Sequence, residues 1–314
     1  MKAITQDVYG SADVLRYAEV EKPTPGPGEV LIRVRAAGVD YGVWHLMTGL
    51  PLLARVIGFG YSRPKVPVRG SEVAGIVEAI GADVTGFHPG DEVFGAATTG
   101  SFAEYAVAPV KKLAHKPPGL TFEQAGALAV SGCTALQALA KLAEGQRVLI
   151  IGAAGGVGSF AVQLAKLRGA QVTGVCSTAK MDLVRSLGAE HVIDYTREAI
   201  SGRYDFILDT GGNRTLAELR RCLTARGRLV LVGGEHGGRV FGGLGRSLRA
   251  PLLGMLTRQK LGGVLGLVRA DDLRRLAELG VQPAIERSYP LCDTADAIRH
   301  LAAGKARGKL VITV

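Results

Sequence analysis

A glycine-rich turn between an apolar run and an amphipathic segment is the clearest sign of a binding site in this chain. Residues 148–151 form an apolar run with the length and β-branched content of a buried parallel strand. Gly155, Gly156 and Val157 follow it, and from Phe160 onward apolar residues recur three and four positions apart, as on one face of a helix. Glycine allows the backbone to approach a pyrophosphate closely, and the helix N-terminus offers unpaired N–H groups. The order strand, glycine turn, helix therefore predicts a dinucleotide site; the alternative is a turn that only packs the helix on the strand.

From about residue 121 onward, strand patterns and helix patterns alternate along the chain, and the glycine turn lies among them. Such alternation predicts an α/β domain with a parallel, doubly wound sheet. We expect strands at 148–151, 171–175, 191–194, 206–209 and 228–232, with helices at 160–168, 179–187 and 215–223. Residues 1–115 instead show short strand patterns broken by glycine and proline, which predicts a small irregular barrel.

Composition narrows the class of protein. A length of 314 residues suggests two domains, and the net charge of +10 would suit an anionic ligand, a nucleic acid or a membrane surface. No nucleic-acid-binding motif is present, so we expect no nucleic-acid partner. The four cysteines are far apart in the sequence, which argues against a local metal knuckle or a disulfide framework and indicates a reducing, cytoplasmic setting. The N-terminus is too polar for a signal peptide, and no apolar run approaches the ~20 residues of a spanning helix.

Residues 236–270 combine positive charge with apolar side chains. Six lysines and arginines occur there without an acidic residue, and leucine and glycine fill most of the remaining positions. The segment could be a lid, an interface or a disordered loop. A basic, apolar segment can also associate with a membrane surface, so a nucleotide-binding protein acting at a membrane or partner surface is the alternative to an enzyme.

Several motifs, in this order along the chain, resemble those of the medium-chain dehydrogenase/reductase superfamily, and most closely its zinc-independent quinone oxidoreductase branch. They are PGPGEVL at 25–31, GSEVAG at 70–75, PGDEV at 89–93, AAGGVG at 153–158, LGA at 187–189, IDY at 193–195 and GK at 308–309. The resemblance covers nearly the whole chain. It implies a GroES-like β-barrel catalytic domain at 1–117, a Rossmann nucleotide-binding domain at 118–258 and a return to the catalytic domain at 259–314.

The resemblance also singles out residues on the acceptor side. Zinc-dependent relatives carry a cysteine where Asp40 stands and a histidine where Ser71 stands, and the serine hydroxyl is a poor zinc ligand. We therefore expect no metal, and hydride transfer to a quinone or an activated C=C bond, which can delocalise its own developing charge. Simple carbonyl reduction is the alternative reaction. Asp40 could accept a hydrogen bond or relay a proton, Tyr41 could donate a proton, and Glu72 is expected to brace the barrel turn.

The residues after the second expected strand of the nucleotide domain favour NADPH. An enzyme that uses NAD usually has an acidic residue there, which binds the ribose hydroxyls of the adenosine. This chain has Ser177 and Lys180 instead, and both suit a 2′-phosphate. Tyr195 matches a tyrosine that similar quinone reductases place near the same phosphate. The alternative is that Lys180 is one more solvated helix charge.

The remaining cofactor positions and the oligomeric state come from the resemblance alone. The cofactor positions, each of which could instead be no more than a tight turn, are Ser131, Thr134, Gly211, Val232, Gly233 and Gly234. The resemblance also implies a homodimer in which the nucleotide-domain sheet continues across a two-fold axis through its edge strand. We expect that strand to be 228–232.

Overall fold

The chain folds into two compact units. The computed structural model describes residues 1–233 and 238–314, apart from the side chain of Ile57. One unit consists of residues 1–133 and 267–314, and the other of residues 134–266.

These divisions differ from the sequence-based boundaries at 117 and 258. Helix α3 (Phe122–Gly126) follows the first boundary, yet it packs on strands β3 (Glu29–Val39) and β4 (Glu72–Ile80) of the first unit. Strand β13 (Lys260–Gly263) follows the second boundary, yet it pairs in the sheet of the second unit. Local sequence patterns mark where elements begin, whereas packing decides to which unit they belong.

The first unit is built around a seven-stranded sheet with the order β14-β15-β3-β4-β5-β7, in which β6 also pairs with β3. The remaining strands of this sheet are β5 (Glu92–Ala96), β6 (Tyr105–Pro109), β7 (Leu113–His115), β14 (Ile285–Pro290) and β15 (Lys309–Thr313). Strands β1 (Lys2–Thr5) and β2 (Arg16–Glu19) pair in a separate two-stranded sheet. Strand β3 pairs antiparallel with β15, β4 and β6, so it lies at the centre of the unit. The β-rich character expected for the N-terminal region is confirmed.

The first unit also contains helices. They are α1 (Tyr41–Thr48), α2 (Leu52–Ala54), α3, α9 (Ala270–Glu278) and α10 (Thr294–Ala302), whereas α4 (Ala129–Ala138) begins in this unit and ends in the second. Helix α1 was not predicted by any sequence pattern. It packs through Val43 and Met47 against Ile298 of α10 and Ile312 of β15, all fully or nearly fully buried. This core fixes the residues at the start of α1, which include Asp40 and Tyr41.

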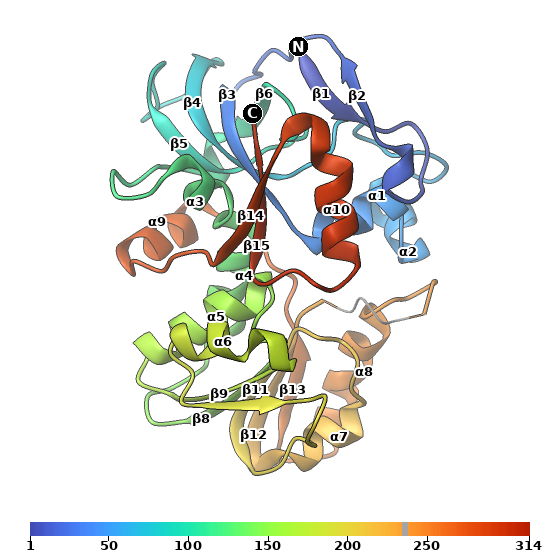
Figure 1. Cartoon of the computed structure of the whole chain (residues 1–314), viewed down its shortest axis with the longest axis vertical. Coiled ribbons are helices and arrows are strands. Elements are labelled where there is room, and N and C mark those ends of the chain that lie inside the picture. The colour runs from blue at the N-terminus through green and yellow to red at the C-terminus, as the bar shows by residue number, and fades with distance from the viewer. Residues whose placement is uncertain (234–237) are drawn as a thin grey trace. The chain divides into compact units, whose positions relative to one another are not determined.

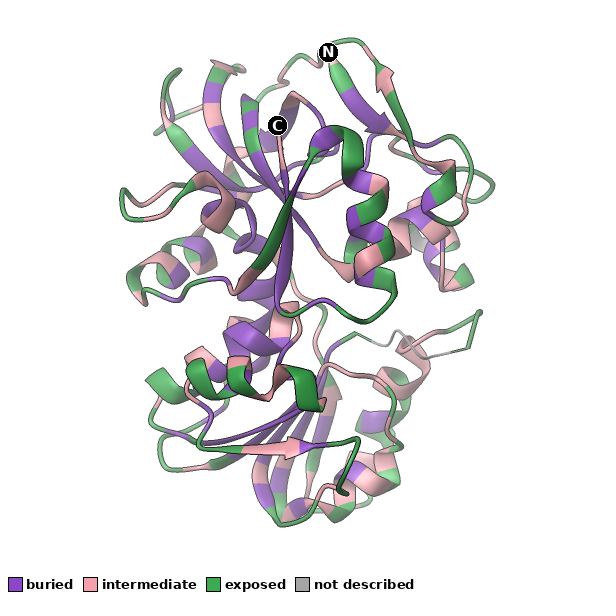
Figure 2. Cartoon of the chain, in the orientation of Figure 1, coloured by how far each residue is buried: buried purple, intermediate pink, exposed green. Residues whose placement is uncertain are grey.

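The second unit has the parallel, doubly wound sheet that the sequence predicts. Its strands, β8 (Arg147–Ile151), β9 (Gln171–Cys176), β10 (His191–Asp194), β11 (Tyr204–Asp209), β12 (Leu223–Leu231) and β13, have the order β10-β9-β8-β11-β12-β13. The helices are α5 (Gly156–Leu167), α6 (Met181–Ser186), α7 (Leu216–Arg221) and α8 (Leu244–Met255). Figure 1 shows α5 and α6 on one side of the sheet and α7 and α8 on the other. Most strand residues are buried, as Figure 2 shows, because both faces of the sheet are covered.

The described part of the basic segment 236–270 contains α8 and β13. The expectation that 228–232 is the edge strand is therefore wrong, since β13 pairs with β12 in parallel and takes the edge position. Sequence patterns do not predict strand β13, because its sequence is KLGG and glycine is unfavourable in strands. They do not predict helix α8, because it contains Pro251, and proline usually ends or kinks a helix.

Candidate functional site

The glycine turn of the second unit has the geometry of an anion site. It follows β8, and Gly152 adopts a φ of +79°, a left-handed conformation that favours glycine. A Cβ atom on Gly158 would lie 2.1 Å from the carbonyl oxygen of Gly152, so only glycine permits this approach of helix to strand. Gly155 is the N-cap of α5 and offers no side chain to its first turn. The first N–H groups of a helix have no intrahelical partner, so those of Gly156 and Val157 can serve a ligand.

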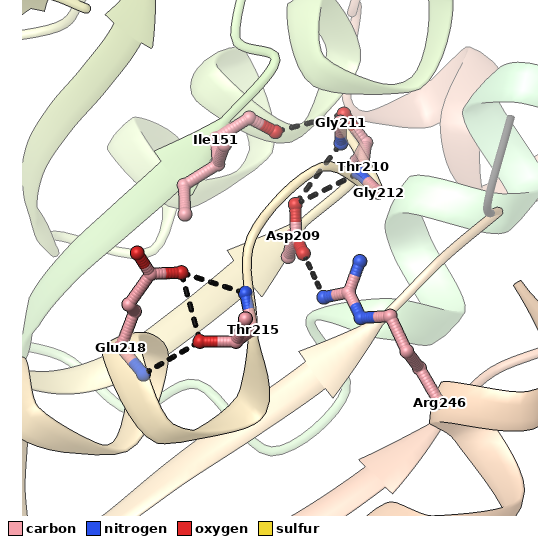
Figure 3. Close-up of polar contacts among 8 residues, drawn as sticks. All are labelled: Ile151, Asp209, Thr210, Gly211, Gly212, Thr215, Glu218 and Arg246. Atoms are coloured by element: carbon pink, nitrogen blue, oxygen red, sulfur yellow. Dashed lines mark hydrogen bonds and ion pairs between the residues drawn. The ribbon is translucent and has the colours of Figure 1, made fainter. Parts of the chain in front are cut away.

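A second turn at the same edge of the sheet is held by Asp209 (Figure 3). Its Oδ1 accepts hydrogen bonds from the N–H groups of Gly211, at 3.1 Å, and Gly212, at 3.2 Å. Its Oδ2 accepts one from Nη2 of Arg246, on α8. The Thr210 hydroxyl donates to the carbonyl of Ile151 at 2.8 Å, which ties this turn to the end of β8. Gly211, one of the predicted cofactor positions, is thus held by Asp209 of β11, which is itself paired with Arg246 of α8.

Arg246 was not identified from the sequence as a site residue. The segment around it contains no acid, but the arginine finds its partner 37 residues away, at the end of β11. The Asp209 side chain is 1% exposed and that of Arg246 is 23% exposed. An acidic residue at the carboxyl end of a buried strand needs hydrogen-bond or ion-pair partners. The position of Asp209 was therefore the one signal in the sequence that a partner such as Arg246 must exist.

The residues predicted for the adenosine end lie together at the ends of β9 and β10. Ser177 follows Cys176 directly and precedes the short turn that ends at Lys180. The Tyr195 N–H donates to the carbonyl of Cys176 at 3.1 Å, and its side chain is 50% exposed. The nearby acid, Asp194, is buried and already engaged.

Asp194 was not identified as a site residue either. Its Oδ2 accepts a hydrogen bond from the Thr178 hydroxyl, and its Oδ1 accepts from the Thr196 hydroxyl at 2.7 Å and the Thr196 N–H at 3.0 Å. These hydrogen bonds hold the pKa of the Asp194 carboxyl below its usual range. The carboxylate therefore connects the loops after β9 and β10 rather than standing open to a ribose.

The other predicted cofactor residues lie at strand and helix ends. The Val232 N–H donates to the carbonyl of Asp209 at 2.9 Å, and Gly233 follows with a φ of +74°. Thr134 is 6% exposed and lies against Gly266. A Cβ atom on residue 266 would collide with the Thr134 hydroxyl, so the contact requires a glycine there. Gly234 lies outside the described residues.

In the first unit, Asp40 is the N-cap of α1. Its Oδ1 accepts a hydrogen bond from the Val43 N–H at 3.2 Å. Its Oδ2 is buried and has no hydrogen-bond partner among the described residues. A buried, unpaired carboxylate oxygen is unfavourable unless a ligand supplies a donor. The sequence pointed to this residue as an acceptor; the structure shows one oxygen used for capping and the other available.

The aromatic residues that follow Asp40 are engaged in packing. The Tyr41 hydroxyl donates to the carbonyl of Leu301 in α10 at 3.2 Å. The Trp44 ring meets the His45 ring edge-on at 5.1 Å, and Nδ1 of His45 lies 2.8 Å from the carbonyl oxygen of Leu50. Burial lowers the pKa of His45. The structure thus ties the proposed proton donor, Tyr41, to α10.

Ser71 directly precedes β4 and Glu72 is its first residue, and the two side chains lie in different surroundings. Ser71 lines a cavity of about 140 Å³ together with Arg69 and Thr98. Glu72 is fully buried and forms an ion pair with Lys309, whose Nζ lies 2.5 Å from Oε2 and 3.3 Å from the Ser131 hydroxyl. Ser131, one of the cofactor positions implied by the resemblance, thus belongs to a buried polar cluster with Glu72 and Lys309. The sequence did not identify Lys309 as a member of this cluster.

No group of three or more histidine, cysteine, aspartate or glutamate side chains that could hold a metal occurs in residues 1–233 and 238–314. All four cysteine thiols are free. Within the same residues, no helix has the length and apolar character needed to cross a membrane.

Comparison with known proteins relates both units to dehydrogenases. Residues 26–118 match the family described as "Alcohol dehydrogenase GroES-like domain", and residues 187–312 match "Zinc-binding dehydrogenase". A quinone oxidoreductase of Pseudomonas aeruginosa is 34% identical over 99% of this chain and 99% of its own.

Solved structures extend this similarity to the whole fold. The quinone oxidoreductase from Coxiella burnetii has a TM-score of 0.88 and 30% identity, covering 100% of this chain and 99% of its own. A mycobacterial protein solved in complex with NADPH has a TM-score of 0.83 and 29% identity, covering 100% of each chain. The expected architecture, a GroES-like barrel with a Rossmann domain, is confirmed.

Proposed function

Because the chain belongs to the quinone oxidoreductase branch of the medium-chain dehydrogenase/reductase superfamily, we propose that it transfers a hydride from NADPH to a quinone or an activated C=C bond without zinc. The observation that carries this proposal is the role of Asp40. At the position where zinc-dependent relatives have a cysteine ligand, it caps α1 with one oxygen and keeps the other unpaired. The relatives support an NAD(P)-dependent oxidoreductase. Our proposal adds the preference for NADPH, the class of acceptor and the independence from zinc.

Because Asp40 and Ser71 do not offer the nitrogen and sulfur donors that zinc favours, we propose that the conjugated acceptor stabilises its own developing charge. NADPH, when bound, would supply a hydride to one carbon of the conjugated bond, and the acceptor's own carbonyl oxygen would take up the displaced electron pair. A proton from solvent or an acidic side chain then completes the reduction. Asp40 can accept a hydrogen bond from a hydroxyl of the substrate or ribose, and Ser71 can donate one to the acceptor. A screen of NADPH oxidation against quinones, enones and simple aldehydes tests the proposal, which fails if aldehydes are the best substrates.

The choice of NADPH rests on the ends of β9 and β10. Ser177 and Lys180 take the place of the acidic residue that would bind ribose hydroxyls, and Tyr195 adjoins them. The only carboxylate at these two strand ends, Asp194, is occupied by Thr178 and Thr196. A 2′-phosphate would therefore meet a cation and hydroxyl donors rather than a repelling charge.

Replacing Lys180 with alanine is expected to narrow the preference for NADPH over NADH. A charge-assisted hydrogen bond to phosphate contributes about 1.5–3 kcal/mol, so NADPH affinity should fall by roughly ten- to a hundredfold while NADH affinity stays nearly constant. Titration of both nucleotides measures this. Equal affinities of the unmodified protein for NADPH and NADH would refute the assignment. The matched control is Lys166→Ala, which removes a lysine on α5 that is paired with Glu190.

Chelation is expected to leave activity unchanged. Neither Asp40 capping α1 nor Ser71 in its small cavity provides the nitrogen and sulfur donors that zinc favours. Elemental analysis should find no stoichiometric zinc in the active protein, and activity should be unaffected after dialysis against a strong chelator. One tightly held zinc per chain, with activity lost on its removal, would contradict the proposal.

We further propose that the protein is a homodimer formed through β13 and α8. Strand β13 is an edge strand, and α8 with its C-cap residue exposes four large apolar side chains between 63% and 82%. They are Leu248, Leu252, Met255 and the C-cap Leu256. Such a surface is normally buried by a partner. Light scattering should report a dimer, and Leu252→Glu should shift it toward monomer, whereas Leu167→Glu, at an exposed leucine on α5, should not. A monomer that co-sediments with anionic vesicles would instead support the membrane alternative.

A further inference from the structure

Arg69 is a buried cation that forms no ion pair with any described residue. The residue is 3% exposed and directly precedes the glycine before Ser71. Its backbone is fixed on both sides, since its N–H donates to the carbonyl of Ile4 at 3.0 Å and its carbonyl accepts from the Phe102 N–H at 2.9 Å. Its Nη1 donates to the carbonyl of Leu46 at 3.3 Å, and its Nε has no partner in the described part of the chain. None of the ion pairs between described residues includes Arg69.

Burying this guanidinium costs free energy that one carbonyl oxygen recovers only in part. Burial lowers the pKa of Arg69 to about 10. The cavity that Arg69 lines offers no opposite charge, because the two charged residues among its described walls, Arg69 and Lys65, are both cations.

The cavity beside Arg69 is small and contains no acidic residue. Its volume is about 140 Å³, and its walls include Arg69, Ser71, Lys65, Thr98 and Phe59. The segment carrying Phe59 is held by the Tyr9 hydroxyl, which lies 2.8 Å from the Phe59 carbonyl oxygen and 2.6 Å from that of Gly60. The space corresponds to about five waters at roughly 30 Å³ each, enough for a carboxylate and a short carbon chain.

We infer that Arg69 binds the carboxylate of the acceptor, so that the favoured substrates are conjugated carbonyl compounds that carry a carboxylate. The planar guanidinium matches a planar carboxylate, and Lys65 adds a second positive charge at the exposed side of the cavity. The inference rests on the proposed function, because Ser71 connects this cavity to the acceptor side. If the proposed function holds, Arg69 makes the enzyme prefer acceptors that carry a negative charge over neutral acceptors with the same activated C=C bond.

A matched pair of acceptors tests the inference. With trans-4-oxo-2-pentenoate and its methyl ester, we expect kcat/KM for the acid to exceed that for the ester by about tenfold or more. Arg69→Met should abolish this ratio and Arg69→Lys should keep part of it. Arg299→Met removes an arginine of the same unit that is exposed and paired with Asp13 and Asp296, and should leave the ratio unchanged. An ester reduced as well as the acid by the unmodified protein would overturn the inference.

Binding and stability measurements separate this inference from the proposed function. Calorimetry with 4-oxopentanoate, the saturated acid, should show binding that weakens about tenfold or more in Arg69→Met, even if neither acceptor is reduced. Failure to reduce either acceptor would count against the proposed function, whereas equal binding of 4-oxopentanoate by both proteins would overturn the role of Arg69. Arg69→Met should melt at the same or a higher temperature, since it removes an uncompensated buried charge. A large fall in Tm would show that the arginine is structural.

Discussion

Replacing Glu72 with glutamine is expected to lower the free energy of unfolding by about 3–5 kcal/mol, because Lys309 would remain buried without its counter-charge. The side chains of the two residues are 0% and 1% exposed, and their charged atoms lie 2.5 Å apart. The carboxylate also accepts a hydrogen bond from the Val130 N–H at 2.6 Å. Burial raises the pKa of Glu72, and Lys309 opposes that shift. Chemical denaturation followed by circular dichroism measures the change.

The double variant makes this prediction specific to the pair. Lys309→Met alone should destabilise by a similar amount, since it leaves a buried carboxylate, but Glu72→Gln with Lys309→Met should cost less than the two single changes together. Glu190→Gln is the control, because its pair with Lys166 is about half exposed and should contribute no more than about 1 kcal/mol. Additive effects at residues 72 and 309 would show that the pair is not coupled.

The parallel sheet and the glycine turn could be predicted because their signals are local. Buried parallel strands are rich in apolar residues, and the strands predicted at 148–151 and 171–175 agree with the buried β8 and β9 to within one residue. Where an element lacks such a run, the prediction fails. Strand β13 contains two glycines in four residues, and only pairing with β12 makes it a strand.

The polar partners of the site could not be predicted, since they join residues far apart in the chain. Glu72 and Lys309 are 237 residues apart, and no pattern in either segment names the other. A carboxylate at a loop-to-helix junction is also ambiguous. The sequence suggested chemistry for Asp40, and the structure shows a helix cap with one oxygen left over. Arg69 stands within a recognisable motif region, but its burial depends on packing against β1 and α1, which is not visible in sequence.

Replacing Asp209 with leucine is expected to weaken NADPH binding by at least about tenfold and to lower the free energy of unfolding by about 3–5 kcal/mol. The substitution removes the acceptor for the N–H groups of Gly211 and Gly212 and leaves Arg246 without its partner (Figure 3). Each buried donor left unsatisfied costs about 1–3 kcal/mol. Freed from its anchor, the turn would no longer hold its backbone at the carboxyl edge of the sheet, where we propose that the nucleotide lies.

Arg246→Leu should be milder, because Asp209 would keep both backbone donors and the arginine is partly exposed; we expect a loss of about 1–3 kcal/mol. Thr215→Ala is the matched control. It removes the cap that Thr215 and Glu218 form at the start of α7, which should cost about 1 kcal/mol and leave NADPH affinity unchanged. Titrations of nicotinamide fluorescence and denaturation curves on all three variants give both quantities. If folded Asp209→Leu bound NADPH as tightly as Thr215→Ala, the turn at Gly211 would not belong to the nucleotide site, and Arg246 would stabilise only the fold.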